Sequence, residues 1–181
     1  MKHRTVILDR DGVINFDDDA YIKSADEWIP IPGSLEAIAR LTRSGYRVVV
    51  VTNQAGIGRG LFDQSTLDAI HDKMKRLAAL LGGSIDEIYF CPHTPQDQCL
   101  CRKPKPGLYH TIAKQLGIDL HGIPSIGDSL RDIQAAAAAG ARPILVRTGN
   151  GRDTEAQLQG KDVPVYDDLA AAVNHLLSAD H

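Results

Sequence analysis

The stretch RTVILDRDGVIN, residues 4–15, decides the fold. It begins with an apolar, β-branched run, Arg4–Leu8, which is typical of a buried strand. Two aspartates, Asp9 and Asp11, follow the run, and Gly12 after them allows the chain to turn sharply. In parallel α/β sheets the ligand binds at the carboxyl ends of the strands. A strand that ends in two acids therefore predicts a sheet with a charged site along that edge.

Short apolar runs alternate with segments of helical periodicity along the rest of the chain. Further strands are expected at Arg47–Thr52, Ile85–Cys91, Pro124–Ile126 and Pro143–Val146, with a marginal edge strand at Val163–Tyr166. Helices are expected at Ser34–Ser44, Ser65–Leu81, Leu108–Leu116, Ser129–Ala139 and Asp168–Leu177, with Ser34, Ser65 and Asp167 as N-caps. This alternation predicts an α/β protein with a doubly wound, mainly parallel sheet flanked by helices. We expect one domain over residues 1–181, without a large cap domain.

The composition is that of an ordinary soluble domain. The 181 residues are 43% hydrophobic and 24% charged. The formal net charge is −3 and there is no basic stripe, which argues against a nucleic-acid partner. No apolar run reaches the ~18 residues of a membrane span, and Met1–Leu8 lacks the apolar core of a signal peptide. We therefore expect a cytoplasmic monomer that binds neither membranes nor nucleic acids.

All the cysteines of the chain, Cys91, Cys99 and Cys101, lie in one short segment together with His93. An odd number of cysteines this close together is a poor disulfide framework. Thiolates and imidazoles are ligands that zinc prefers, and four of them close a tetrahedral structural site. We expect the loop 91–101, after the third strand, to hold a structural Zn²⁺. The alternatives are free thiols beside a histidine, or a zinc knuckle for nucleic acid, which the net charge disfavours.

Other predicted strands also lead into polar residues. Thr52 ends the second strand, Lys103 follows the cysteine loop and Asp128 follows the fourth strand. The carboxyl ends of parallel strands meet at one edge, so we expect these groups to converge with Asp9 and Asp11. Three close carboxylates need a cation, and ligands that are all oxygen favour Mg²⁺. A lysine and a hydroxyl suit phosphoryl oxygens, so the set indicates phosphoryl transfer.

The positions of the two aspartates predict their roles. Asp9 ends a strand, where a carboxylate can attack phosphorus in line as a nucleophile. Asp11 is placed to protonate the leaving alkoxide and then to deprotonate the attacking water. The expected reaction is a hydrolysis through an aspartyl phosphate, with Mg²⁺ and Lys103 stabilising the charge. Each motif alone is ambiguous, since Asp-x-Asp-Gly often forms a turn and Gly127-Asp128-Ser129 can merely cap a helix.

Together the motifs resemble those of the haloacid dehalogenase superfamily of aspartate-nucleophile phosphatases. The residues that carry the resemblance are Asp9-Arg-Asp11-Gly12, Thr52, Lys103 and Gly127-Asp128. The resemblance implies that Mg²⁺ is bound by the Asp9 carboxylate, the Asp11 backbone carbonyl and Asp128. We expect Asp132, one helical turn further on, to support these ligands rather than to bind the ion.

The cysteine loop before Arg102-Lys103-Pro104 resembles two groups within the superfamily. One group removes the 7-phosphate of a heptose 1,7-bisphosphate, a precursor of nucleotide-activated heptose for lipopolysaccharide and other surface glycans. The other hydrolyses histidinol phosphate. Arg59 and Arg102 favour the sugar bisphosphate, which is anionic at both ends, whereas histidinol phosphate carries an ammonium. Histidinol phosphate or another small phosphomonoester stays the alternative, and Arg59 could instead simply close a glycine-rich turn.

Further substrate-binding residues are expected in three loops. Asp17 begins a run of three acids that could accept hydrogen bonds from sugar hydroxyls or form a solvated turn. Ser129 stands where the related phosphatases often carry a lysine. The remaining histidines, His71 among them, show no cysteine or acidic partner and are interpreted as surface or helix residues. The complete set of expected substrate contacts is Asp17, Asn53, Gln54, Ala55, Arg59, Arg102 and Ser129.

Overall fold

The computed structural model describes residues 4–180, so Met1–His3 and His181 lie outside the description. Six parallel strands form one sheet in the order β3-β2-β1-β4-β5-β6. The order reverses between β1 and β4, which places the ligand-binding crevice at their carboxyl ends. The predicted doubly wound parallel sheet is confirmed. Its strands are β1 (Arg4–Leu8), β2 (Tyr46–Asn53), β3 (Glu87–Cys91), β4 (Pro124–Gly127), β5 (Arg142–Val146) and β6 (Val165–Tyr166).

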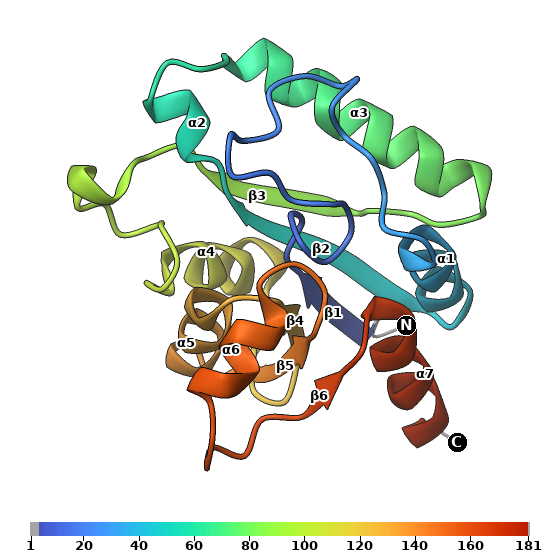
Figure 1. The fold of residues 1–181 in the computed structure, drawn as a ribbon. Helices are drawn as coiled ribbons and strands as arrows, with labels where there is room; N and C mark the ends of the chain where they lie inside the picture. The colour runs from blue at the N-terminus through green and yellow to red at the C-terminus, as the bar shows by residue number, and fades with distance from the viewer. Residues whose placement is uncertain (1–3, 181) are drawn as a thin grey trace.

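Helices cover both faces of the sheet (Figure 1). Helices α1, α3 and α7 pack on one face and α4, α5 and α6 on the other. Two short helices, α2 and α6, were not predicted, because each is a short segment without apolar periodicity. The helices are α1 (Ser34–Arg43), α2 (Ala55–Gly58), α3 (Gln64–Leu80), α4 (Gly107–Leu116), α5 (Leu130–Ala138), α6 (Gly151–Gln157) and α7 (Leu169–Ala179).

The continuous apolar run of β2 is explained by burial on both faces. Val48 and Val50 belong to the core under α1, α3 and α7, whereas Val49 and Val51 face the core under α4 and α5. All four are essentially inaccessible, and burying each valine contributes about 1.5–3 kcal/mol. Strand register aligns the site, because Leu8 pairs with both Val50 and Ile126. The residues that follow these three positions therefore reach the crevice at one level.

Three predicted N-caps are wrong by one or two residues. Ser34 is the first residue of α1, and its Oγ donates to the backbone of the β1–α1 loop instead of capping. Asp63 rather than Ser65 caps α3, and Asp168 rather than Asp167 caps α7. Asp63 and Asp168 have extended backbone and accept from an N–H three residues later, whereas the cap of α1 is Gly33, which has a positive φ and no side chain to accept.

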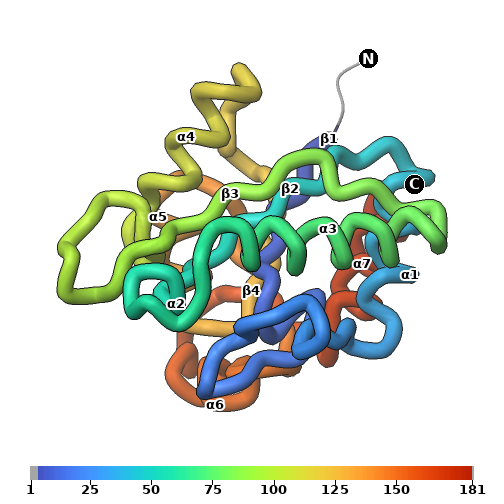
Figure 2. Tube along the Cα trace, turned by 90° about the horizontal axis from the view of Figure 1, so that it is seen from above, coloured from blue at the N-terminus to red at the C-terminus, as the bar shows by residue number. Residues whose placement is uncertain are grey.

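Two long connections flank the crevice. Residues 9–33, between β1 and α1, lie beside α3 (Figure 1), where Lys73 Nζ donates to the carbonyls of Ala25 and Trp28 at 2.7 Å each. The connection after β3 projects from the body of the molecule (Figures 1 and 2). Within residues 4–180 neither connection forms a folded cap domain. None of the described helices is both long and apolar enough to span a membrane.

Candidate active site

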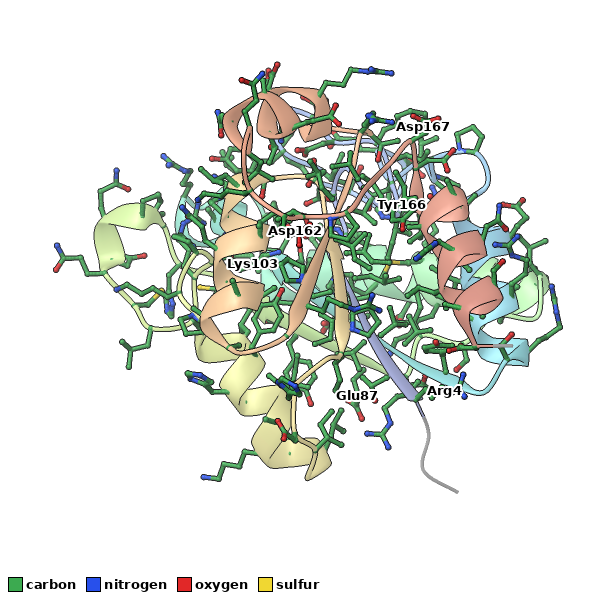
Figure 3. The ribbon with its side chains drawn as sticks, turned by 90° about the horizontal axis from the view of Figure 1, so that it is seen from below. Arg4, Glu87, Lys103, Asp162, Tyr166 and Asp167 are labelled. Carbon is green, nitrogen blue, oxygen red and sulfur yellow. The ribbon has the colours of Figure 1, made fainter. Side chains whose placement is uncertain are left out.

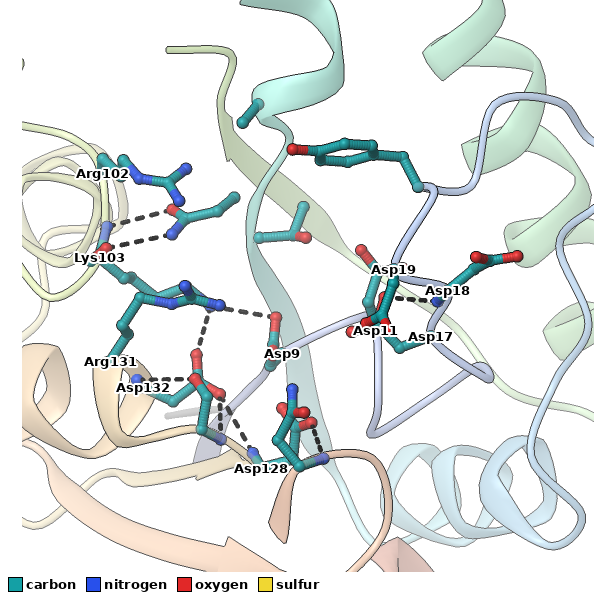
Figure 4. A pocket seen from close by; sticks show the side chains of 16 residues that line it. Asp9, Asp11, Asp17, Asp18, Asp19, Arg102, Lys103, Asp128, Arg131 and Asp132 are labelled. Atoms are coloured by element: carbon teal, nitrogen blue, oxygen red, sulfur yellow. Dashed lines mark hydrogen bonds and ion pairs between the residues drawn. The ribbon is translucent and has the colours of Figure 1, made fainter. Parts of the chain in front are cut away.

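A pocket of about 260 Å³ opens at the carboxyl ends of β1, β2 and β4. Figure 4 shows Asp9 in its centre, between an acidic wall and a basic wall. The acidic wall consists of Asp17, Asp18 and Asp19 from the β1–α1 loop, and the basic wall includes Arg102 and Arg131. The structure brings most of the predicted site residues together. Those that line the pocket are Asp9, Asp11, Asp17, Thr52, Asn53, Ala55, Arg102, Lys103, Asp128 and Ser129.

Lys103 is a buried cation that lines the pocket, with 2% of its surface exposed. Figure 3 shows it inside the fold, whereas Arg4 lies at the rim. Its Nζ donates to Asp132 Oδ1 at 2.6 Å, to Val51 O at 2.9 Å and to Asp9 Oδ1 at 3.0 Å. An ammonium has three hydrogens, so all of them are used. Lys103 is therefore held rigidly beside Asp9 and acts there mainly through its charge.

Asn53 fixes the backbone of that lysine. Its amide nitrogen donates to Lys103 O at 3.1 Å, and its amide oxygen accepts from Lys103 N at 3.1 Å. This reciprocal pair joins the end of β2 to the segment that follows the cysteine loop. The position of Lys103 thus depends on β2 and on its ion pairs as well as on the loop.

The carboxylates of Asp9, Asp128 and Asp132 have oxygens within 4.8 Å of one another. Burial, followed by repulsion from Asp132, raises the pKa of Asp128 to about 7 and raises that of Asp9. Burial also disfavours the charge on Asp132, but the ammonium of Lys103 outweighs it and lowers that pKa to about 2. Three acids share one lysine, so full ionisation leaves an excess of two negative charges. A divalent cation between Asp9 and Asp128 would balance it.

Asp132 uses its oxygens within the protein, as expected of a supporting residue. Oδ1 accepts from Lys103, and Oδ2 accepts from the backbone N–H groups of Asp128 and Ser129 at 3.1 Å each. Ser129 in turn caps α5, its Oγ accepting from Asp132 N. The helix-cap interpretation of Ser129 is therefore correct, and the same residue lines the pocket.

The β5–α6 loop contacts Asp128 and fixes its position, and this contact was not predicted from the sequence. Asn150 N donates to Asp128 Oδ2 at 2.9 Å. Gly12 and Gly149 have φ of +86° and +56°, and a Cβ on either would lie within 2.2 Å of the same oxygen. Both glycines are therefore needed for the turn and for the close approach. Gly149, in the loop after β5, is the residue of the sequence that could have indicated this close approach to Asp128.

Three side chains contact the carboxylate of Asp11. Oδ1 accepts from Arg10 Nε and from Asn15 Nδ2 at 2.9 Å each, and Arg10 Nη2 lies 2.7 Å from it in an ion pair. Oδ2 accepts from Gln54 Nε2 at 3.1 Å. Gln54 Nε2 also donates to Thr52 Oγ1 at 2.9 Å, which leaves the Thr52 hydroxyl hydrogen free to donate into the pocket.

Two expected substrate contacts are not among the residues that line the pocket. Gln54 is 4% exposed and lies behind Asp11 and Thr52, so it supports residues that face the cavity. Arg59 is exposed, because the unpredicted turn of α2 carries it away from the end of β2. Conversely, Arg131 lines the pocket and was missed. Its position in the first turn of a helix whose cap faces the pocket could have indicated it.

The cysteine loop forms a compact candidate metal centre. The ligand atoms of Cys91, His93, Cys99 and Cys101 lie within 4.8 Å of one another. The sulfur–sulfur distances are 2.6, 3.5 and 3.6 Å, and His93 Nδ1 lies 3.4 and 3.6 Å from two of the sulfurs. Tetrahedral zinc with Zn–S bonds of ~2.3 Å has edges of about 3.8 Å, close to most of these distances. The donor set fits a closed metal site, and all three cysteines are free of disulfides.

Comparison with known proteins gives consistent results. A family model described as polynucleotide kinase 3 phosphatase matches residues 5–135, and one described as HAD-hydrolase-like matches residues 100–172. A curated protein of Bordetella bronchiseptica, D-glycero-beta-D-manno-heptose-1,7-bisphosphate 7-phosphatase, is 58% identical over 96% of this chain and 98% of its own length. The protein of that name from Pseudomonas aeruginosa is 50% identical, over 98% of this chain and 99% of its own.

A solved structure agrees with these relatives. The crystal structure of D,D-heptose 1,7-bisphosphate phosphatase from B. bronchiseptica, complexed with magnesium and phosphate, superposes with a TM-score of 0.95. It is 57% identical in sequence and covers 97% of this chain and 99% of its own.

Proposed function

Because the chain belongs to the family of D-glycero-β-D-manno-heptose-1,7-bisphosphate 7-phosphatases, within the haloacid dehalogenase-like hydrolases, we propose that it removes the 7-phosphate of that sugar bisphosphate. The protein is a phosphoric monoester hydrolase. The observation that carries the substrate proposal is the pocket itself, where Asp9 lies between an acidic and a basic wall. A polyol with a phosphate at each end matches these walls.

Mg²⁺ fits the acidic cluster. Asp9, Asp128 and the backbone carbonyl of Asp11 would hold it, and the related Bordetella enzyme was crystallised with magnesium and phosphate. The two excess negative charges of the cluster support a divalent rather than a monovalent ion. When bound, Mg²⁺ neutralises charge on the phosphoryl oxygens and helps to orient the group.

The side chains supply the remaining steps. Asp9 attacks phosphorus, forming an O–P bond while the bond to the sugar oxygen breaks. The departing oxygen keeps the bonding electrons and takes a proton from Asp11. Asp11 then removes a proton from water, which attacks the phosphoryl group and frees the Asp9 carboxylate. Throughout, the positive charge of Lys103 and the hydroxyl of Thr52 favour the negative phosphoryl oxygens.

Recognition of the rest of the substrate is assigned to the walls. Arg102 and Arg131 are placed for the second phosphate, since guanidinium groups bind phosphate in a bidentate manner. Asp17 and its two neighbours are placed for sugar hydroxyls. Asn53, Ala55 and Ser129 complete the lining, while Gln54 and Arg59 are given no direct contact.

The cysteine loop is proposed to hold Zn²⁺ with a structural role. Four protein ligands leave no open position for a water, so the ion would fold the loop rather than take part in chemistry. Arg102 Nη1 donates to His93 O at 3.3 Å, which links the loop to the basic wall. We further propose a single-domain, cytoplasmic monomer that acts in surface-glycan precursor synthesis.

Phosphate release from a substrate panel tests the function. The panel contains heptose 1,7-bisphosphate, fructose 1,6-bisphosphate, heptose 7-phosphate and histidinol phosphate, each with and without Mg²⁺. We expect the highest kcat/KM for the heptose bisphosphate and dependence on Mg²⁺. A higher value for histidinol phosphate would overturn the substrate assignment, and Mg²⁺-independent turnover would overturn the metal assignment.

A further inference from the structure

Arg10 is a buried charge that the mechanism above does not use. It stands in the sequence between Asp9 and Asp11, the two aspartates that follow β1, and has no exposed surface. Burying a guanidinium costs several kcal/mol unless its donors are satisfied. Its Nε donates to Asp11 Oδ1 at 2.9 Å, and its Nη2 lies 2.7 Å from the same oxygen in an ion pair. The third nitrogen, Nη1, lies 3.1 Å from Nε2 of His71, which is 7% exposed.

The contact with arginine determines the state of the histidine ring. Arginine has only donors, so His71 Nε2 must accept the hydrogen bond. His71 is therefore neutral, with its proton on Nδ1. Burial and the adjacent Arg10 charge also lower the pKa of His71 to about 3, in agreement with this state. Helix α3 thus contributes a fixed acceptor that holds one edge of the Arg10 guanidinium.

The donors around Asp11 are distributed unequally between its oxygens. Oδ1 accepts two hydrogen bonds, from Arg10 Nε and from Asn15 Nδ2, and it also forms an ion pair with Arg10 Nη2. Oδ2 accepts one, from Gln54. Two donors occupy both lone pairs of a carboxylate oxygen, and the charge of the adjacent guanidinium opposes a proton there as well. The proton that Asp11 transfers must therefore reside on Oδ2.

Resting on the proposed aspartyl-phosphate mechanism, we infer that Arg10 and His71 form a positioning pair: His71 orients the guanidinium, and Arg10 saturates Oδ1 of Asp11 so that Oδ2 carries the catalytic proton. In the first step that proton moves from Oδ2 to the sugar oxygen as the P–O bond breaks and its electrons stay on oxygen. In the second step a water proton returns to Oδ2. His71 acts through Arg10 and touches no reacting atom.

Leaving-group dependence separates this role from a merely structural one. The value of kcat/KM reports the steps up to formation of the aspartyl phosphate. A sugar alkoxide needs a proton to leave, whereas 4-nitrophenolate does not. A misplaced Asp11 should therefore slow the hydrolysis of sugar phosphates and leave the hydrolysis of 4-nitrophenyl phosphate nearly unchanged.

Three variants carry the test. His71→Leu removes the acceptor, while His71→Gln offers an amide oxygen near the Nε2 position. Met74→Ala is the matched control, since Met74 is a fully buried residue of the same helix with an apolar side chain. The value of kcat/KM is measured for each variant, for the wild type and for Asp11→Asn, with the heptose bisphosphate and with 4-nitrophenyl phosphate. Each assay is run well below the Tm of the protein assayed.

We expect His71→Leu to lower kcat/KM for the sugar about 10- to 100-fold and for the aryl phosphate less than about threefold. For His71→Gln, kcat/KM should stay within about threefold of the wild-type value for both substrates. Met74→Ala should lower Tm without changing the ratio of kcat/KM for the sugar to kcat/KM for the aryl phosphate. Equal losses on both substrates for His71→Leu, or no loss in a folded protein, would overturn the inference. If Asp11→Asn itself lost activity equally on both substrates, the role of Asp11 as the general acid, which belongs to the proposed function, would be overturned instead.

Discussion

The carboxylate cluster and the cysteine loop hold their charged groups by different means. In the cluster, Asp9, Asp128 and Asp132 each accept hydrogen bonds from backbone N–H groups, and Lys103 adds ion pairs. In the loop, the thiols and His93 chiefly face one another. The cluster is thus organised by the protein before any ion binds, whereas we expect the geometry of the loop to depend on a bound ion. A preorganised site is suited to catalysis, and a site that depends on an ion is suited to a structural role.

Asp9→Asn should have the largest effect, because it removes the nucleophile from the organised cluster. We expect phosphate release to fall at least about 10³-fold, with Tm within a few degrees of the wild type. Assays of inorganic phosphate and calorimetry measure the two quantities. Substantial turnover by this variant would contradict the covalent route, while Asp11→Asn serves as the control for a variant that keeps the nucleophile.

Asp132→Asn tests whether the cluster is organised by internal charge pairs. Removing one partner of a buried ion pair leaves Lys103 undercompensated and costs about 3 kcal/mol of unfolding free energy. We expect kcat to fall about 10²-fold, because Lys103 shifts relative to Asp9. Denaturant unfolding and steady-state kinetics give both values. A variant of unchanged stability and rate would mean that Asp132 does not set the position of the lysine.

Cys99→Ser tests the loop side of the comparison. It should lose Zn²⁺, measured by elemental analysis, and raise KM for the sugar bisphosphate about three- to tenfold as Arg102 moves. The kcat should stay within about threefold, since Lys103 is also held by Asp132, Val51 and Asn53. An equally large fall in kcat would show that the two regions are not independent. Unchanged kcat and KM in a zinc-free protein would show that the loop contributes neither to substrate recognition nor to turnover.

The smallest expected effect concerns pH and the support beneath Asp11. His71 has a pKa of about 3 in the native state against 6.5 when unfolded, so below pH 6.5 the unfolded chain binds a proton that the native protein does not. The free energy of unfolding therefore falls as pH drops from 6.5 toward 3. Between about pH 7 and about pH 5 this contribution reaches up to about 2 kcal/mol. His71→Gln should lack this part of the slope, and identical slopes in urea unfolding would contradict the buried neutral histidine.

Much of the fold and of the catalytic centre was predictable because it is encoded locally. The two-sided apolar runs of β1 and β2 indicate strands covered on both faces, and the polar residues after them converge because parallel strands share one edge. Asp9, Asp11, Thr52, Lys103 and Asp128 were found in this way and line one pocket. The grouping of the three cysteines and His93 was equally visible in the sequence.

The amino-acid sequence by itself thus determined the sheet and the residue types brought to its edge, since both follow from periodicity and strand order. Tertiary structure alone decided which supporting residues meet them. Arg10 and His71 are 61 positions apart, and Asn150 reaches Asp128 from another loop. The removal of Arg59 from the pocket and the entry of Arg131 likewise depend on where α2 and α5 begin. Such contacts arise from packing between distant segments, where burial and hydrogen-bond satisfaction act together, and no local pattern records them.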